Sequence, residues 1–424
     1  MKKSKFLNDS LLMIISSGIG QFILIITTPV VSRIYSPSQF GEFTIFSNIA
    51  MILIPIINAR YDLLIINAKN QHKANVLSQI SFIISAVIIL CLIPISIIFL
   101  IIFPQYILDI IFVIITLVLV SFTNIFTNYL NRERNYKALS IINIFRSASM
   151  TLIQIGLGVL HFGSLGLIIG FAFSYISGIG IGYRTFKRYF YIITDKQEVR
   201  NEFLEHKNQL IYSTPSILLN SLSFSIVIFF LGILYTNEEV GIYGMTIRIL
   251  GIPVTIISLG LSKIFMQRAN DYYLKYGTFR NLLLKFSGAL IVLSIALYIP
   301  FYLLSENIVN LILGSQWLGT ITVMQITIPL FAIRLLVSTV SLSVVVIKKQ
   351  QIELMLQASF VIGTVITFYI SKIASLEFMQ FVELNTAVLI ASYSLFYVVL
   401  YHFSKKQKIF NHDKYEINIK ISGD

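Results

Sequence analysis

Long uninterrupted runs of apolar residues constrain this chain more than any other feature. Residues 11–31 and 80–103 are two such runs, each about 20 residues or longer. A helix rises ~1.5 Å per residue, so each run is long enough to cross ~30 Å of hydrocarbon. Because no water reaches the backbone there, a helix is the expected form. The runs therefore predict transmembrane helices.

The composition supports a membrane protein over a soluble one. Hydrophobic residues make up 56% of the chain and charged residues 12%, with a mean hydropathy of +0.83. A soluble domain carries about twice that charged fraction. The first apolar run is too long for a cleavable signal peptide and lacks a small-x-small cleavage site. It is therefore interpreted as the first span.

The predicted fold is an all-α integral membrane protein with about twelve transmembrane helices. The expected spans are 11–31, 43–66, 77–101, 107–128, 140–160, 164–186, 211–234, 241–262, 283–304, 320–346, 352–373 and 382–403. With both termini placed in the cytoplasm, the inside segments contain 26 lysines and arginines, and the outside connections contain only Arg33 and Lys372. This asymmetry follows the positive-inside rule. The net charge of +13 therefore indicates orientation in the membrane and not a nucleic-acid partner.

The twelve spans divide into two groups of six. Residues 1–186 are predicted to form an N-terminal six-helix bundle and residues 210–404 a C-terminal one. The polar stretch 187–209 is interpreted as a cytoplasmic linker, and 405–424 as a cytoplasmic tail.

A short motif repeats at an offset of 200 residues. Residues 35–43, Tyr-Ser-Pro-Ser-Gln-Phe-Gly-Glu-Phe, align without a gap with residues 235–243, Tyr-Thr-Asn-Glu-Glu-Val-Gly-Ile-Tyr. Because six is even, the second copy would enter the membrane in the same orientation as the first. This predicts two bundles related by a pseudo-twofold axis along the membrane normal. Chance similarity between two helix connections is the alternative.

Four arginines lie too far inside expected spans to be placed in loops: Arg60, Arg146, Arg248 and Arg334. An arginine in hydrocarbon costs at least ~2.5 kcal/mol, so such residues usually face a cavity or a partner. A guanidinium group suits phosphate and carboxylate. We therefore expect these four residues to bind an anionic substrate group in a cationic cavity. Snorkelling or structural pairing is the alternative interpretation.

Asp62 is the one carboxylate that lies more than about a turn inside an expected span. Residues at i and i+2 do not face each other on a helix, so Arg60 is not its expected partner. A residue of another helix is expected instead, with Arg146 as a candidate. Burial would raise its pKa, which makes Asp62 the candidate for coupling to H⁺ or Na⁺. An ion pair at a helix end is the alternative.

The patterns of soluble enzymes do not occur in the sequence. We find no phosphate-binding loop and no nucleophile elbow. The five histidines are not paired with a second His or a Cys at metal-ligand spacing. We therefore predict no catalytic residue, no cofactor and no metal site.

Two segments resemble a known family. Ser17-Gly18 through residues 35–43, followed by Ala59-Arg60-Tyr61-Asp62, is similar to the start of polysaccharide flippases. These are the O-antigen and capsule-repeat exporters of the multidrug/oligosaccharidyl-lipid/polysaccharide superfamily. The resemblance extends over the whole chain in length and in the number of spans. Arg60 and Asp62 occupy the family's Arg-Tyr-acid positions, while the other three arginines are assigned from the cavity argument alone.

The resemblance implies a flippase in the bacterial cytoplasmic (inner) membrane. Its substrate would be an undecaprenyl-pyrophosphate-linked oligosaccharide, moved from the inner to the outer leaflet by rocking of two bundles and coupled to H⁺ or Na⁺. Membrane lipids, a polysaccharide polymerase and chain-length proteins are the other expected partners. Two alternatives remain open: an exporter of drugs or metabolites from the same superfamily, and a membrane polymerase or ligase that joins sugar repeats. The second would need a substantial outside loop, and the longest expected here is about 305–319.

Overall fold

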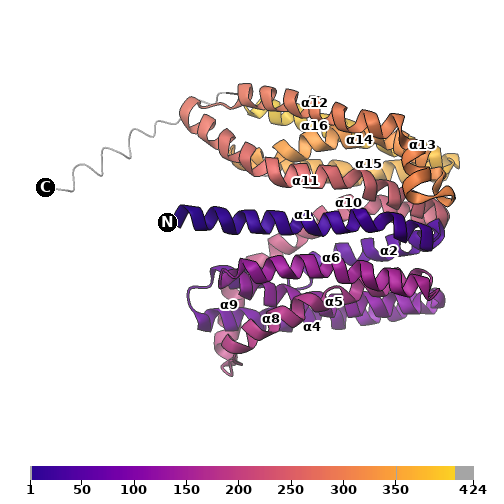
Figure 1. The fold of residues 1–424 in the computed structure, drawn as a ribbon. Helices are drawn as coiled ribbons and strands as arrows, with labels where there is room; N and C mark the ends of the chain where they lie inside the picture. The colour runs from indigo at the N-terminus through magenta and orange to yellow at the C-terminus, as the bar shows by residue number, and fades with distance from the viewer. Residues whose placement is uncertain (1, 350, 406–424) are drawn as a thin grey trace. The chain divides into compact units, whose positions relative to one another are not determined.

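The computed structural model describes residues 2–349 and 351–405, with only the backbone described for residues 2–11, 14 and 259. Residues 406–424, most of the expected cytoplasmic tail, lie outside the described residues. Most of the described part is helical (Figure 1). The α-helices are α1 (Lys2–Ile34), α2 (Pro37–Leu53), α3 (Tyr61–Leu64), α4 (Gln71–Ile102), α5 (Ile107–Arg132), α6 (Tyr136–Val159), α7 (Ser164–Phe173), α8 (Ile176–Tyr189), α9 (Lys196–Glu205), α10 (Thr214–Leu234), α11 (Asn237–Tyr276), α12 (Arg280–Leu303), α13 (Ser305–Ile308), α14 (Gly319–Val340), α15 (Gln351–Ala374) and α16 (Phe378–Phe403). Short 3-10 helices cover Ile54–Ile56, Ile65–Asn67, Pro104–Tyr106, Ser315–Trp317 and Ser341–Val345, and π-helices cover Gln209–Ser213 and Val309–Leu313.

Twelve helical segments of the described chain are long and apolar enough to cross a membrane. The predicted all-α membrane fold with about twelve spans is therefore confirmed. Several boundaries differ from the expected ones. The eighth span belongs to a helix that continues past the expected residue 262 to Tyr276, and the sixth is interrupted between α7 and α8.

The second expected span, 43–66, is wrong as a continuous helix. Its helix α2 ends at Leu53, and a 3-10 turn and a non-helical turn follow before the single turn of α3. Pro55 lies at this point, and a proline has no N–H to continue the helical hydrogen bonds. The second candidate span accordingly ends at Ile56.

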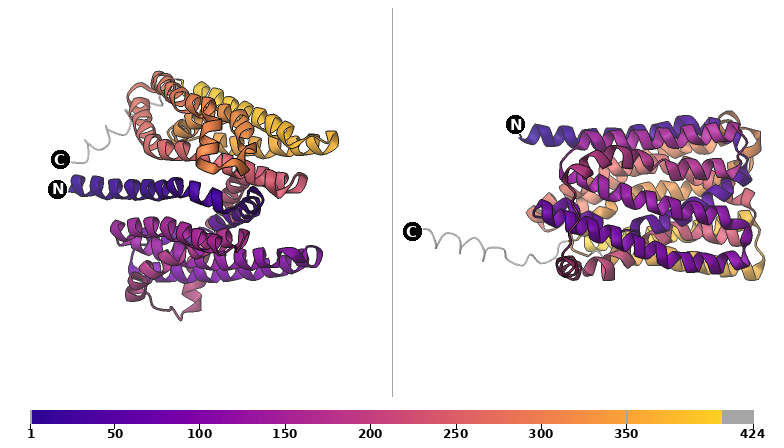
Figure 2. Two further views of the ribbon diagram at one scale, coloured as in Figure 1. Left: turned by 45° about the vertical axis from the view of Figure 1, so that its right-hand side comes forward. Right: turned by 90° about the horizontal axis from the view of Figure 1, so that it is seen from below.

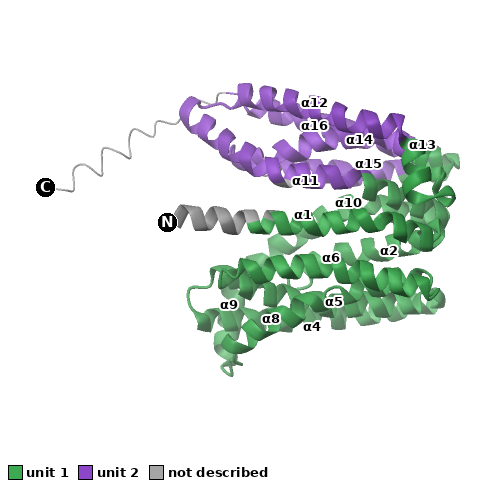
Figure 3. Ribbon diagram, in the orientation of Figure 1, with its two compact units in different colours: residues 1–249, 305–323, 368–379 green, residues 250–304, 324–367, 380–424 purple. Residues whose placement is uncertain are grey.

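The chain forms two compact units, shown in different colours in Figure 3. Unit 1 comprises residues 1–249, 305–323 and 368–379, and unit 2 the remaining residues. These units divide the chain differently from the two six-helix bundles expected on either side of residues 187–209. The bundle organisation stays a prediction.

Unit 1 is a set of long helices that run beside one another, with α1 against α6 and α5 against both α4 and α8 (Figures 1 and 2). Small residues on α7 and α8 permit this packing. A β-carbon added to Gly178 would lie 2.4 Å from Thr123 Cγ2, and one added to Gly182 would lie 2.6 Å from Phe126 Cβ. Without Cβ atoms, helices approach closely and gain van der Waals contact. Helix α8 is thereby held tightly against α5.

Unit 2 contains most of α11 together with α12, α14, α15 and α16. Its helices are joined by polar contacts as well as by packing. The Tyr298 hydroxyl of α12 donates to the Leu250 carbonyl at 3.0 Å, and the hydroxyls of Ser258 and Ser338 lie 2.7 Å apart. Such interhelical hydrogen bonds contribute where the hydrophobic effect between helices is weak.

Candidate functional site

The segment after α2 has an unusual backbone. Ala59 and Arg60 both adopt a positive φ, of 43° and 63°. A residue with a β-carbon in this left-handed conformation costs roughly 1–2 kcal/mol. Two in succession, neither of them glycine, must be held in place by surrounding contacts. Strained backbone of this kind is concentrated at functional sites.

One polar face of α5 holds this segment. Ser121, Asn124, Asn128 and Arg132 are three or four residues apart, so they share a helix face. Asn58 is 1% exposed; its Nδ2 donates to Ser121 Oγ at 2.9 Å, and its Oδ1 accepts from Asn124 Nδ2 at 3.1 Å. Asn128 Nδ2 donates to Asp62 Oδ2 at 3.0 Å.

Arg132, at the end of the same face, donates to the carbonyl oxygens of Ile65 and Ala68. The face therefore supports the broken segment from Asn58 to Ala68 along its whole length. Hydrogen bonds of this kind replace those that the interrupted helix cannot make.

Asp62 is 8% exposed and lies outside the twelve candidate spans. Burial raises the pKa of its carboxyl group to about 6, although backbone hydrogen bonds and the charge of Arg60 act in the opposite direction. The expectation that another helix supplies its partner is confirmed, but the partner is Asn128 of α5 and not Arg146. The candidate Arg146 was wrong because its side chain is engaged elsewhere.

Arg146 of α6 contacts Tyr175, which lies in the break between α7 and α8. Its Nη2 donates to the Tyr175 hydroxyl at 2.6 Å, and its Cζ lies 4.0 Å from the centre of the ring. Tyr175 is in turn held by its carbonyl, which accepts from Thr123 Oγ1 at 2.9 Å. A hydrogen bond and a cation–π contact to one ring fix the guanidinium group without neutralising it.

Arg248 of α11 has a buried nitrogen with no partner. Its Nη2 makes no hydrogen bond to the protein, and its Cζ lies 5.8 Å from the centre of the Phe40 ring. An unsatisfied buried donor costs about 1–3 kcal/mol, and more if it is charged. Among the residues that the structure describes, none accepts a hydrogen bond from this nitrogen.

Arg60 is half-buried, and no ion pair involves Arg60, Arg146 or Arg248 in the described residues. Arg334 belongs to unit 2, whereas the other three arginines belong to unit 1. Its Cζ lies 5.6 Å from the centre of the Phe331 ring. The assignment of all four arginines to a common cavity stays a prediction.

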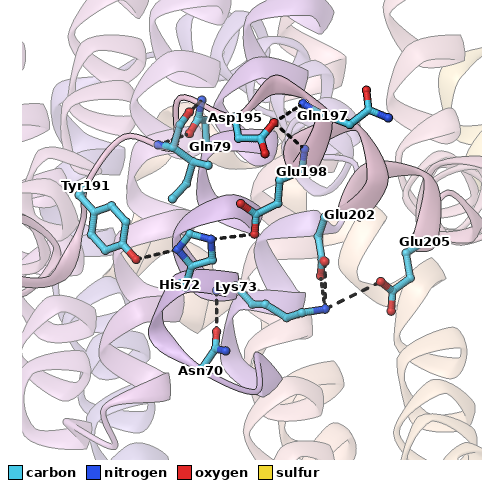
Figure 4. A network of polar contacts seen from close by, with 11 residues as sticks. Asn70, His72, Lys73, Gln79, Tyr191, Asp195, Gln197, Glu198, Glu202 and Glu205 are labelled. Carbon is cyan, nitrogen blue, oxygen red and sulfur yellow. Dashed lines mark hydrogen bonds and ion pairs between the residues drawn. The ribbon is translucent and has the colours of Figure 1, made fainter.

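A second polar network joins α9 to α4 (Figure 4). Lys73 Nζ lies 3.0 Å from a Glu202 carboxylate oxygen, and His72 Nε2 lies 2.7 Å from Glu198 Oε1. Helix α9 also contacts the broken segment, because the Tyr61 hydroxyl donates to the Phe203 carbonyl at 2.9 Å. The expected linker 187–209 therefore includes a helix that belongs to unit 1 and packs on α4.

Sequence reasoning identified Arg60, Asp62 and Arg146 but missed Asn58, Ser121 and Tyr175 as supports of their segments. The signal for Asn58 was present, because it follows Pro55 by three residues and precedes the Arg-Tyr-Asp triplet. Tyr175 had no comparable signal. Its role depends on the interruption between α7 and α8, which the apolar pattern does not reveal.

Comparison with known proteins identifies a family. Residues 30–322 match the family described as "Polysaccharide biosynthesis protein". No match was found among the curated proteins.

Three solved structures illustrate the fold. The lipid II flippase MurJ in an inward closed conformation has a TM-score of 0.66 at 16% identity, over 93% of this chain and 87% of that one. An inward-facing multidrug resistance MATE family transporter of the MOP superfamily has a TM-score of 0.61 at 15% identity, over 94% and 96%. A MOP superfamily transporter from Pyrococcus furiosus, with a binding pocket described as having reverse polarity, has a TM-score of 0.55 at 15% identity, over 93% of each chain.

The resemblance to transporters seen in the sequence is therefore confirmed at the level of family and fold. The match covers more than half of the chain, and the structural similarity covers nearly all of it. The chain belongs to the polysaccharide biosynthesis protein family, and its fold, with twelve candidate spans, is similar to that of MOP-superfamily transporters.

Proposed function

We propose that this protein is a flippase that moves an undecaprenyl-pyrophosphate-linked oligosaccharide repeat unit from the inner to the outer leaflet of the bacterial cytoplasmic membrane. The family is one of polysaccharide biosynthesis, and one of the similar folds is a lipid II flippase. The observation that carries the proposal is Arg248, whose buried Nη2 has no acceptor in the protein.

The chemistry of the substrate fits the arginines. A pyrophosphate carries several negative oxygens, and guanidinium groups bind such oxygens with two parallel hydrogen bonds. Arg60, Arg146 and Arg248 form no ion pair with a carboxylate in the described residues. We assign these three residues and Arg334 to the substrate's phosphates, with alternating access of the two bundles around them.

Asp62 is the proposed coupling residue. Its carboxyl group is buried, its pKa is raised, and it lies in the strained segment that α5 holds. A proton or Na⁺ that binds there would change the charge beside Arg60. The coupling would then act on the same segment that carries a substrate-binding arginine.

The proposed orientation has both termini in the cytoplasm. The support is the distribution of lysines and arginines, because connections rich in these residues tend to lie on the cytoplasmic side of a membrane. A cysteine-accessibility measurement would test it: Cys91 is replaced and single cysteines are introduced at Arg134 and at Lys372. Reaction of position 372 alone with an impermeant thiol reagent in intact cells agrees with the proposal, and reaction of position 134 alone reverses the orientation.

Deletion of the gene in its host tests the function. Lipid-linked sugars are extracted and the leaflet in which they reside is determined. We expect single pyrophosphate-linked repeat units to accumulate on the cytoplasmic side while surface polymer disappears. Unpolymerised units in the outer leaflet would point to a polymerase instead, and unchanged lipid-linked sugars would favour an exporter of small molecules.

A further inference from the structure

A basic pocket lies where three candidate spans end on the same side of unit 1. It has a volume of about 620 Å³, and its lining includes Arg134, Arg184 and Arg188 together with Glu133, Asn135 and Tyr189. Helix α5 ends at Arg132, α6 begins at Tyr136 and α8 ends at Tyr189. The pocket is therefore located at the level where helices leave the membrane. We call it the helix-end pocket.

The three arginines of this pocket are exposed and unneutralised. Glu133 is the one carboxylate that lines the pocket, and no ion pair involves Arg134, Arg184 or Arg188 within the part of the chain that the structure describes. Arg184 and Arg188 lie four residues apart on α8, where like charges destabilise a helix. Neighbouring Arg132 differs, because its guanidinium group is bound to backbone carbonyls.

The start of α6 adds to the positive potential. Asn135 caps this helix by accepting from the Ala138 amide at 3.1 Å, and it also lines the pocket. The N-terminus of a helix carries a partial positive charge and attracts anions. The pocket thus combines three free guanidinium groups with a helix N-terminus, a combination suited to phosphate oxygens.

A second feature, the exposed face of α8, suits a phosphate that is attached to a lipid. Ile176, Gly180, Arg184 and Arg188 follow one another at intervals of four residues on α8, and all four are exposed. A β-carbon added to Gly180 would meet no atom within 4 Å. These four residues therefore form an exposed face of α8. Its first part, Ile176 and Gly180, is apolar, and its end, Arg184 and Arg188, is cationic. An acyl or prenyl chain can lie along the first part while its phosphate reaches the arginines.

We propose that the helix-end pocket binds the phosphate group of an anionic lipid, as a site separate from the arginines assigned to transport. Two lipids carry this chemistry: an anionic phospholipid of the surrounding leaflet, and a polyprenyl pyrophosphate. Both would place phosphate oxygens between Arg184 and Arg188 and their chains along α8. The proposal does not depend on the flippase assignment.

Binding of defined lipids to the purified full-length protein tests the proposal. Native mass spectrometry from detergent micelles would compare phosphatidylglycerol, phosphatidylcholine and a C55 polyprenyl pyrophosphate. We expect phosphatidylglycerol or the pyrophosphate lipid to be retained more strongly than phosphatidylcholine. Whichever of the two is retained more strongly is the lipid that the pocket prefers. Displacement of the bound lipid by an equal concentration of inorganic pyrophosphate would overturn the proposal, because the site would then bind a soluble anion.

Two double variants make the test specific. Arg184→Gln/Arg188→Gln should weaken anionic lipid retention about fivefold or more, because each surface arginine contributes about that factor to binding an anionic lipid. Lys187→Gln/Lys196→Gln removes two exposed charges nearby that do not line the pocket, and it should weaken retention less than the arginine variant does. Equal weakening by the two double variants would show a general charge effect and overturn the site. Unfolding temperatures measured without added lipid establish that both variants are folded.

Discussion

Gly41 and Gly241 face each other across the contact between α2 and α11. A β-carbon added to Gly41 would lie 1.8 Å from the Asn237 carbonyl oxygen, and one added to Gly241 would lie 1.8 Å from the Pro37 carbonyl oxygen. The two glycines and their two carbonyl partners are each 200 residues apart. The contact is therefore reciprocal, as it is where two copies of a motif meet about a local twofold axis.

The residues around these glycines repeat the same pattern. Ser36 and Gln39 form a capping box at the start of α2, with mutual hydrogen bonds of 3.1 and 3.3 Å. Thr236 and Glu239 make the same pair of bonds at the start of α11, of 2.9 and 3.3 Å. The motif seen in the sequence at an offset of 200 residues is thus a repeat in local structure as well.

Gly41→Ala should destabilise the protein strongly. The added methyl group would collide with backbone, which cannot rotate away as a side chain can, so α2 and α11 would have to separate. We expect a loss of about 1–3 kcal/mol in the free energy of unfolding, the range of overpacked cores, seen as a lower unfolding temperature of the purified protein. Gly156→Ala is the matched control, since its β-carbon would meet nothing within 4 Å. Equal unfolding temperatures for both variants would contradict the close contact.

Asp62→Asn should remove a pH dependence of transport without unfolding the protein. Asparagine is close in shape to the protonated acid and can still accept from Asn128. Because the pKa of Asp62 is raised to about 6, the native carboxyl group is mostly protonated below that pH and ionised above it. Flipping measured in proteoliposomes from pH 5 to 8 should vary around pH 6 in the native protein and lose this step in the variant. A step that persists in Asp62→Asn would assign the titration to another group.

Arg334→Ala should abolish export, while Arg334→Lys should retain part of it. Lysine keeps the positive charge but cannot offer the paired donors of guanidinium to a phosphate. Surface polymer is measured in a deletion host that expresses each variant at a matched level. Normal export by the alanine variant would remove Arg334 from the proposed substrate site. The Arg280→Ala variant of unit 2, whose arginine stacks on Tyr401 at 4.2 Å, serves as the control for loss of an arginine outside that site.

The contact between α9 and α4 should depend on charge pairing. Lys73→Glu would oppose Glu202, whose side chain is 9% exposed, and should lower stability by about 1.5–3 kcal/mol, as for hydrogen bonds to charged groups. Lys73→Glu/Glu202→Lys should recover part of that loss, because the pair is restored with its signs exchanged. Thermal unfolding of the purified protein measures both. Equal stability of the single and double variants would show that the pair contributes nothing.

The number of spans could be predicted because length and apolarity are local properties of each run. The close approach of a neighbouring helix to α8 was also predictable, since Gly178 and Gly182 recur at a four-residue interval, but that this neighbour is α5 was not. The break before Arg60 could not be placed in the same way. A proline such as Pro55 is compatible with a kinked but continuous transmembrane helix. Here the helix ends, and the side chain of Asn58 makes hydrogen bonds to Ser121 and Asn124 on α5.

The hydrogen-bond partners of the candidate site residues could not be predicted from the sequence either. The sequence marked Arg146 and Asp62 as costly in a membrane, but their spacing does not indicate which helix packs beside each one. Asp62 bonds to Asn128, and Arg146 bonds to Tyr175. Both contacts depend on interrupted helices, the first after α2 and the second between α7 and α8. At such an interruption the side chains point in directions that differ from those on an ideal helix.

Arg248→Met should separate stability from function. Methionine has a similar length and no donor, so it removes the buried Nη2 that lacks an acceptor and keeps the packing against Phe40. Removing an unsatisfied buried donor should leave the unfolding temperature unchanged or raise it, by the equivalent of about 1–3 kcal/mol.

Export by the same variant should fall at least tenfold, because the donor that we assign to the substrate's phosphate is gone. Surface polymer in the deletion host, normalised to the amount of protein in the membrane, measures the loss. Arg248→Lys keeps the charge and should retain part of the activity. A stable Arg248→Met protein with full export would show that the unpaired nitrogen has no part in binding the substrate. A variant that loses stability and export together would show that Arg248 acts through the structure of unit 1.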